Sequence, residues 1–301
     1  MRVVSLLPAA TDAIVALGAV ETLVGVSHEC DANAVAGLPR VTGTVVDAGA
    51  GARDVDAEVR RLAHEGTPLF SIDEAGIEAL HPDVIFTQAV CDVCAVREED
   101  VRALAARLSP APRVVALGAT TLEEMFEDLA RIGEALQGAG EPLELISGLR
   151  ARLRGVHERL KAARAPRPRV AIVEWTEPLF AAGHWAPDLV RRAGGVDVLA
   201  TAGDQSRERQ VDDVRSSDPE FLIVAPCGYS LDRSEHAARE LLGRDEWEWA
   251  RSRHVWALDA NRLLSRPGPG LVDGALTLAS IFHPTLFPAP DAASARRVTV
   301  E

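Results

Sequence analysis

The chain alternates short apolar runs with longer stretches of helical spacing, and turn residues separate the two kinds of segment. Apolar runs of this length between helices are typical of the strands in parallel βαβ units. The pattern predicts strands over 3–7, 23–27, 69–71, 84–88 and 113–117, and then over 169–174, 196–200, 221–225 and 255–258. Helices are expected to begin near Thr11, Asp54, Glu74, Arg97 and Thr121, and later near Ala186, Val211, Ser234 and Gly270. The predicted fold class is therefore α/β.

The second half of the chain repeats the first half with different loops. Segments 2–7 and 12–27 are echoed by 169–174 and 188–203, segment 81–86 by 218–223, and segment 113–117 by 254–258. Chance similarity among segments rich in Ala, Val and Leu does not readily give such matches at three places in the same order, the first place comprising the two segments 2–7 and 12–27. The repeat predicts two Rossmann-like lobes with a cleft between them, and clefts between lobes commonly bind small ligands.

One long amphipathic segment, 142–165, lies between the two halves. Apolar residues recur along it at helical spacing, while Arg, Lys and Glu cover the remainder. Pro142 suits a first helical turn, and Pro166 and Pro168 prevent continuation. We expect a linker helix that holds the lobes at a nearly fixed angle; the alternative is one more packing helix. The predicted domains are an N-terminal lobe (1–140), the linker helix (141–166), a C-terminal lobe (167–290) and a frayed tail (291–301).

The composition is that of an ordinary globular chain of 301 residues, with 47% hydrophobic and 26% charged residues. A formal net charge of −13 argues against nucleic acid as a partner and against general binding to anionic lipid. No apolar stretch is long enough to cross a membrane, and none of signal-peptide length precedes the first strand. The sequence predicts a cytoplasmic protein without membrane insertion, and a periplasmic or extracellular one only if a leader was removed.

Polar and aromatic residues gather at the predicted carboxyl ends of the strands, where parallel sheets meet their ligands. Thr11 is expected to cap a helix whose free N–H groups face the cleft. The predicted ligand contacts are Pro8, Thr11, His28, Glu29, Gln88, Trp175, His184, Trp185, Tyr229, Asn261 and Arg266.

Some of these contacts have specific expected roles. Trp175 and Trp185 offer flat aromatic faces that suit a macrocycle with a large apolar surface, and the alternative for each is core packing. His28 and His184 are candidate axial ligands to cobalt or iron, or else hydrogen-bonded structural residues. Arg266 is a candidate to bind a ligand carboxylate, amide or phosphate, or to form a salt bridge within its lobe. Three other tryptophans are interpreted as packing residues: Trp247, Trp249 and Trp256.

All four cysteines also fall at predicted carboxyl ends of strands. Cys91 and Cys94 have a Cys-x-x-Cys spacing that serves zinc, redox and iron–sulfur chemistry alike. With Cys30 and Cys227 they make a potential four-thiolate set, with His28 as a substitute ligand. The hypothesis is a metal or redox site that holds zinc or an iron–sulfur group; the alternative is a set of separate thiols.

The sequence resembles the cobalamin-type periplasmic-binding domain family, which comprises the solute-binding partners of ABC importers for corrinoids, haem and iron-siderophores. The resemblance extends from about Val3 to Pro284 and is most specific in segment 5–11, in Leu17-Gly18 and in Pro82-Asp83. Members labelled cobalamin-binding proteins look closer still, since they carry a Ser-His-Glu-Cys-Asp, a Cys-x-x-Cys, a Gly-His-Trp and a Pro-Cys-Gly like those present here. The resemblance implies the class III solute-binding fold, with two α/β lobes joined by one long helix.

Importer-docking members of this family share a glutamate on each lobe that meets permease arginines. The matching positions here hold Ala75 and Asp212, with Glu74 adjacent. Docking to an ABC permease is therefore in question on this alignment.

The predicted function is binding of cobalamin, or of a related corrinoid or metallo-ligand, in the cleft between the lobes. The protein would act as a solute-binding protein for a permease, or as a cytosolic carrier that hands its ligand to a corrinoid enzyme. No Gly-x-Gly-x-x-Gly, P-loop or nucleophile elbow is present, so the prediction is not an enzyme. The alternative is a cysteine-based metal or redox protein, or an enzyme, that acts on a metallo-ligand.

Overall fold

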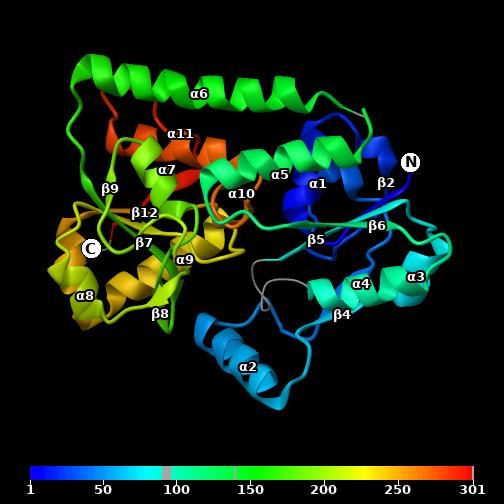
Figure 1. The fold of residues 1–301 in the computed structure, drawn as a ribbon. Coiled ribbons are helices and arrows are strands. Elements are labelled where there is room, and N and C mark those ends of the chain that lie inside the picture. Colours follow the sequence, from blue (N-terminus) through cyan, green and yellow to red (C-terminus); the bar gives the residue numbers. More distant parts are fainter. Residues whose placement is uncertain (90–95, 139, 300–301) are drawn as a thin grey trace. The chain divides into compact units, whose positions relative to one another are not determined.

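A computed structural model describes residues 1–89, 96–138 and 140–299. It divides into two compact units. The N-terminal unit comprises Met1–Ala119 and Glu123–Ser147, and the C-terminal unit comprises Thr120–Leu122 and Gly148–Glu301. The predicted α/β class is confirmed, and each unit contains its own sheet with helices around it (Figure 1).

The N-terminal unit is built on a parallel four-stranded sheet in the order β2-β1-β5-β6. Its strands are β1 (Val3–Ser5), β2 (Leu23–Val26), β5 (Val84–Gln88) and β6 (Arg113–Leu117), and its helices are α1 (Pro8–Ala16), α2 (Ala52–Glu65), α3 (Glu74–Ala79), α4 (Glu98–Arg107) and α5 (Leu122–Ala135). Short 3-10 helices η1 (Val20–Thr22) and η2 (Asn33–Val35) and an antiparallel pair, β3 (Thr42–Thr44) with β4 (Phe70–Ile72), complete the unit. Strand residues Val4 and Ile85 pack with the helix residues Ile77, Val101 and Leu104 in one buried cluster.

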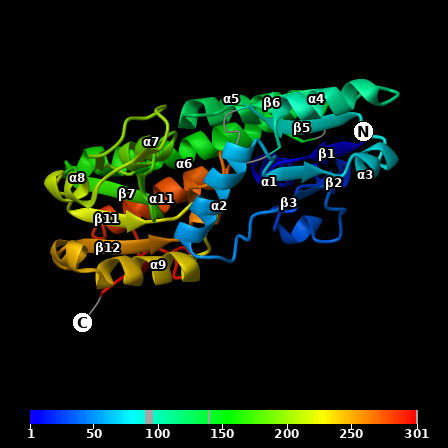
Figure 2. The ribbon, with the colours of Figure 1, turned by 90° about the horizontal axis from the view of Figure 1, so that it is seen from below.

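The C-terminal unit has a mixed sheet in the order β10-β8-β7-β11-β12-β13, with β9 paired to β7. The strands are β7 (Arg169–Thr176), β8 (Leu179–Ala181), β9 (Val196–Asp197), β10 (Arg207–Glu208), β11 (Phe221–Val224), β12 (His254–Leu258) and β13 (Ala295–Arg297). Its helices are α7 (Ala186–Arg192), α8 (Val211–Ser216), α9 (Leu231–Gly243), η3 (Asp245–Ser252), α10 (Ala260–Leu263) and α11 (Gly270–Phe282). Helix α9 packs against β12 (Figure 2). Strand β12 pairs with β11, which in turn pairs with β7. The core of this unit includes Trp247, which is 1% exposed, as predicted for a packing residue.

The internal repeat is visible in the backbone of the two units. In each, three parallel strands that the repeat matches lie side by side, as β1-β5-β6 and β7-β11-β12. His81 and Asp218 precede the matching prolines and both have positive φ, 42° and 44°. Gly18 and Gly194 follow the ends of α1 and α7 and also have positive φ, which glycine adopts without steric cost. The two halves therefore share turns as well as strands.

The linker segment forms helix α6 (Pro142–Ala163), and the division between the units falls within it. Leu149, Leu153 and Val156 are buried, as the apolar pattern predicts. Leu143, at the first turn, is 79% exposed, so the apolar stripe is buried only farther along the helix. Among the helices of the described residues, none combines the length and apolar character needed to cross a membrane.

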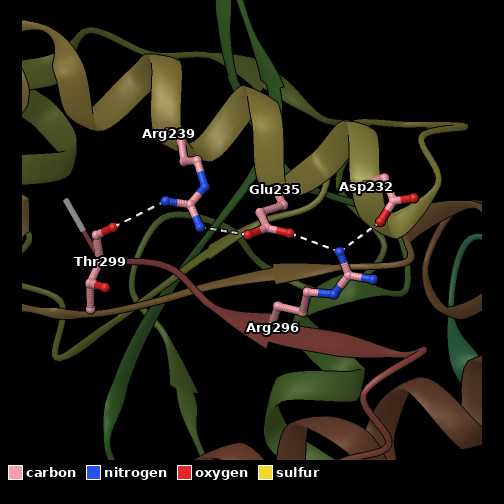
Figure 3. A network of polar contacts seen from close by, with 5 residues as sticks. All are labelled: Asp232, Glu235, Arg239, Arg296 and Thr299. Carbon is pink, nitrogen blue, oxygen red and sulfur yellow. Dashed lines mark hydrogen bonds and ion pairs between the residues drawn. The ribbon is translucent and has the colours of Figure 1, made fainter.

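A frayed tail was predicted over 291–301, and for the described residues 291–299 the structure shows otherwise. Strand β13 pairs antiparallel with β12, and Val298 is buried in the core of the C-terminal unit. Arg296 donates to Asp232 and Glu235 on α9 at 2.6 and 2.8 Å (Figure 3). Proline and small residues suggested disorder, but the exposed edge of β12 offers backbone partners that order the segment.

Candidate ligand-binding site

Strand β7 and the loops that follow β11 and β12 meet at the carboxyl ends of these three strands. The Cys227 amide donates to the Glu174 carbonyl oxygen at 3.0 Å, and the Asn261 amide donates to the Tyr229 carbonyl oxygen at 3.0 Å. The Gly228 amide donates to Ser265 Oγ at 2.9 Å. These bonds join residues that are distant in sequence into one platform, at the place where parallel sheets present residues to ligands.

An aromatic pair stands on this platform. The rings of Trp175 and Tyr229 pack edge to face, with centroids 5.6 Å apart. The Arg233 guanidinium lies 3.8 Å from the centroid of the Tyr229 ring, in cation–π geometry. Tyr229 is only 7% exposed, whereas Trp175 is partly exposed. The buried Tyr229 ring therefore contacts Trp175 at its edge, and Trp175 retains exposed surface for a ligand.

His184 and Trp185 lie on the turn between β8 and α7. The His184 amide donates to the Asp204 carbonyl oxygen at 2.6 Å, and the Gly203 amide donates to the His184 carbonyl oxygen at 2.9 Å. The Trp185 indole Nε1 donates to the Leu264 carbonyl oxygen at 2.6 Å. Burial lowers the pKa of His184, which favours the neutral imidazole that binds metals. Both rings are partly exposed and held at fixed positions.

The structure brings together the predicted contacts Asn261 and Arg266. Arg266 Nη2 donates to Asn261 Oδ1 at 2.9 Å, and Arg266 is 9% exposed. The amide oxygen thus orients the guanidinium beside the platform.

The sequence did not include Glu174 and Ser206 among the predicted contacts. Ser206 Oγ donates to Glu174 Oε2 at 2.8 Å and accepts from the Gly183 amide at 3.0 Å. Burial raises the pKa of Glu174, and the hydrogen bonds from Ser206 and Gly183 act in the opposite direction. Only the position of Glu174 at the end of a predicted strand hinted at a role. Ser206 carries no local signal.

His28 is the most informative predicted residue of the N-terminal unit. Its Nδ1 lies 2.7 Å from Thr42 Oγ1, and that hydroxyl donates to Ser27 Oγ at 3.1 Å. The Thr42 hydroxyl donates its single proton to Ser27, so it can only accept a hydrogen bond from His28 Nδ1. Nδ1 then carries the proton of the neutral imidazole, and Nε2 carries the lone pair. Nε2 is buried and has no hydrogen-bond partner among the described residues. Burial and the positive charge of Arg40 lower the pKa of His28, so the neutral form is favoured.

The predicted role of Thr11 as a helix cap is wrong. Helix α1 begins at Pro8, its N-cap is Leu7 without a side-chain cap, and Thr11 lies inside the helix with 0% exposure. Thr11 Oγ1 donates to Ser5 Oγ at 2.9 Å and lies 3.1 Å from Cys30 Sγ. Proline at the first position starts the helix earlier than the threonine suggested. Thr11 is thus a buried polar residue of this unit.

The remaining predicted contacts of the N-terminal unit occupy varied positions. Glu29 is exposed after β2, Pro8 is half-buried at the first turn of α1, and Gln88 is half-buried at the end of β5.

Two cavities of the C-terminal unit, of about 160 and 350 Å³, are lined by none of the predicted contacts.

The four cysteines divide into three cases. Cys30 is 3% exposed in the N-terminal unit, and Cys227 is exposed in the C-terminal unit. Cys91 and Cys94 lie outside the described residues. Within the described ranges, no three His, Cys, Asp or Glu side chains are grouped as metal ligands would be. The four-cysteine site remains a prediction.

Comparison with known proteins gives one family. The model of a family described as periplasmic binding protein matches residues 3–261. This match confirms the resemblance identified from the sequence. No curated protein matches the chain.

Several solved structures share the fold. A periplasmic haem binding protein from Pseudomonas aeruginosa has 22% identity and a TM-score of 0.73, with 100% of this chain and 98% of that chain covered. An ABC transporter substrate-binding protein from Listeria monocytogenes has 17% identity and a TM-score of 0.68, with coverage of 94% and 98%. A periplasmic vitamin B12 binding protein of Vibrio cholerae has 22% identity and a TM-score of 0.60, with coverage of 93% and 96%. At these identities the similarity shows the fold.

The predicted cytoplasmic location is wrong. The matched family consists of periplasmic binding proteins, and a periplasmic location fits the chain better. The prediction relied on where the sequence starts, whereas a secretory leader is removed from the mature protein and takes no part in its fold.

Proposed function

The chain belongs to the periplasmic binding protein family, and from that premise we propose that it binds a metallo-tetrapyrrole ligand, with cobalamin or a related corrinoid first and haem second. It would pass this ligand to an ABC permease. Proteins of the same fold that are described as binding haem and vitamin B12 support this ligand class.

The observation that carries the proposal is the unpartnered Nε2 of His28. A buried polar atom without a hydrogen bond is costly, and such atoms are rare in folded proteins. The bond from Nδ1 to Thr42 fixes the ring and leaves the lone pair on Nε2. This is the arrangement found in metal-binding histidines, where the second nitrogen is hydrogen-bonded to an oxygen. His28 is therefore our first candidate for the axial ligand, ahead of His184, and metal binding requires that the side chains covering its buried Nε2 move aside.

The C-terminal unit, taken by itself, also carries residues whose chemistry suits such a ligand. Trp175 and Trp185 each present part of a flat ring, and a stacked ring contributes about 1 kcal/mol beyond the area that it buries. Arg266, oriented by Asn261, matches the amide, carboxylate or phosphate groups at the rim of a tetrapyrrole.

The alternative of cysteine-based metal or redox chemistry receives less support. Cys30 is buried against Thr11 Oγ1, which is the environment of a structural thiol.

The proposal is tested by visible absorption spectroscopy of protein purified anaerobically, before and after incubation with aquacobalamin or haemin and removal of excess by gel filtration. We expect near-stoichiometric retention of one probe with a shifted spectrum, because an imidazole replaces water on the metal. His28→Ala should abolish the shift. His236→Ala is the control, since His236 is 75% exposed on α9. Retention of neither probe by the unaltered protein would overturn the proposal.

A further inference from the structure

The turn that carries His184 and Trp185 is held by a second segment of the C-terminal unit, residues 199–209, which we call the strap. Within the strap, β10 pairs antiparallel with β8, so that Arg207 lies opposite Ala181 and Glu208 opposite Phe180. This pairing places the strap directly against the residues that follow β8, which are those of the turn.

Three hydrogen bonds join the strap to the turn. The His184 amide donates to the Asp204 carbonyl oxygen, the Gly203 amide donates to the His184 carbonyl oxygen, and the Gly183 amide donates to Ser206 Oγ at 3.0 Å. The contact is also close, because a Cβ on Gly183 would lie 2.5 Å from backbone atoms of the strap. The turn and the strap are therefore closely packed and joined by hydrogen bonds on both sides of His184.

The turn depends on these bonds. His184 has φ of 49°, in the left-handed region that non-glycine residues rarely occupy. Such a conformation persists only where the surrounding structure determines it. Here the strap bonds both the amide and the carbonyl of His184, and so determines the direction of its side chain.

One carboxylate anchors the strap to the sheet. Ser206 Oγ donates to Glu174 Oε2 at 2.8 Å. Glu174 lies on the central strand β7, next to Trp175, and its carbonyl oxygen accepts from the Cys227 amide. The same residue thus contacts the strap and a platform loop.

We propose that Glu174 is a positioning residue for the ligand site: through Ser206 it fixes the strap, and through the strap it holds His184 and Trp185 in the conformation that meets the ligand. The ligand named in this inference rests on the proposed function. The effect of Glu174 on the conformation of the turn does not. Burial of the Glu174 carboxyl raises its pKa, which is consistent with a side chain that lies inside the unit between the sheet and the strap. Loss of the Ser206 donor would leave that carboxylate without its strap contact.

The experiment compares Glu174→Ala, Glu174→Gln and Ser206→Ala in the full-length chain. Glutamine keeps an oxygen that accepts from Ser206, so it should restore what alanine removes. Glu240→Ala, which alters a carboxylate 62% exposed on α9, is the control. The first measurement is hydrogen exchange of the His184 and Gly203 amides without any ligand, where we expect exchange at least about tenfold faster in Glu174→Ala and Ser206→Ala.

The second measurement is the affinity for aquacobalamin and for haemin by spectrophotometric titration. We expect Glu174→Ala and Ser206→Ala to weaken binding about tenfold, and Glu174→Gln to stay within about threefold of the unaltered protein. Unchanged exchange, or faster exchange with unchanged affinity, overturns the inference. If the unaltered protein binds neither probe, the proposed ligand class fails, and exchange alone decides whether Glu174 holds the turn. If Glu174→Ala does not fold, Ser206→Ala provides the same test.

Discussion

Replacing Gly183 with alanine tests how closely the strap and the turn pack. The added Cβ would lie 2.5 Å from the Asp204 oxygen, the Gln205 carbonyl carbon and the Ser206 nitrogen, all of them backbone atoms. Ordinary contacts are near 3.5 Å or longer, so the strap must move by about 1 Å. Overpacking of this kind costs about 1–3 kcal/mol. The displacement also stretches the two hydrogen bonds that Gly183 and His184 donate to the strap, at about 1 kcal/mol each.

We therefore expect Gly183→Ala to destabilise the C-terminal unit by about 3 kcal/mol, which corresponds to roughly 6–12 °C in melting temperature for a unit of this size. The assay is thermal unfolding followed by circular dichroism, with hydrogen exchange of the His184 amide as a local readout. Gly243→Ala is the matched control, because Gly243 ends α9 and a Cβ there meets nothing within 4 Å. If the two variants melt within about 1 °C of each other and the His184 amide exchanges at its usual rate, the close packing inferred here is wrong.

Three further predictions concern other parts of the molecule. Burial raises the pKa of Asp197 from 3.8 to about 6. The native state therefore binds a proton more tightly than the unfolded state, and the free energy of unfolding should fall as pH rises from about 4 to 6. Urea unfolding at several pH values should show that Asp197→Asn flattens this dependence by up to about 3 kcal/mol. In the same assay, Trp247→Ala should lower the free energy of unfolding by about 3–5 kcal/mol, since the ring is 1% exposed in the core. A decrease below about 1 kcal/mol would contradict the placement of this ring in the core. In the native protein Cys227 should react quickly with a thiol reagent while Cys30, 3% exposed, does not; Cys227→Ser should therefore remove one fast-reacting thiol, and Cys30→Ser should remove none.

Much of the fold could be predicted from local sequence pattern. Strands β1, β5 and β6 and their counterparts β7, β11 and β12 are largely apolar runs of three to eight residues with turn residues beside them. Such runs are buried on both faces of a parallel sheet, so their pattern does not depend on distant partners. Helix α6 was equally clear, because its apolar spacing and flanking prolines are local features.

The sequence did not predict β3, β8, β10 and β13, which have two or three residues each, and β10 and β13 lie at the two ends of the strand order in the C-terminal sheet. Strand β10 consists of Arg207 and Glu208, both exposed, and it has no apolar run to mark it. Strand β13 follows a segment rich in proline and small residues. The predicted strand over 196–200 ends at Asp197 instead, because the Asp197 carboxylate accepts from the Leu199 and Ala200 amides and turns the chain. These elements depend on the neighbouring strand rather than on their own residues.

The sequence by itself determined the repeated parallel strands and therefore the positions at or just after their carboxyl ends, where Trp175, Tyr229, Asn261 and His28 lie. Only the tertiary structure decided what those residues do. It buried Thr11, packed Tyr229 edge to face with Trp175, left His28 Nε2 without a partner among the described residues, and brought Ser206 to Glu174 from 32 positions away. The physical reason is that apolar periodicity is a property of neighbouring residues, whereas hydrogen bonds between side chains and the exposure of a ring depend on which distant segments the sheet pairs together.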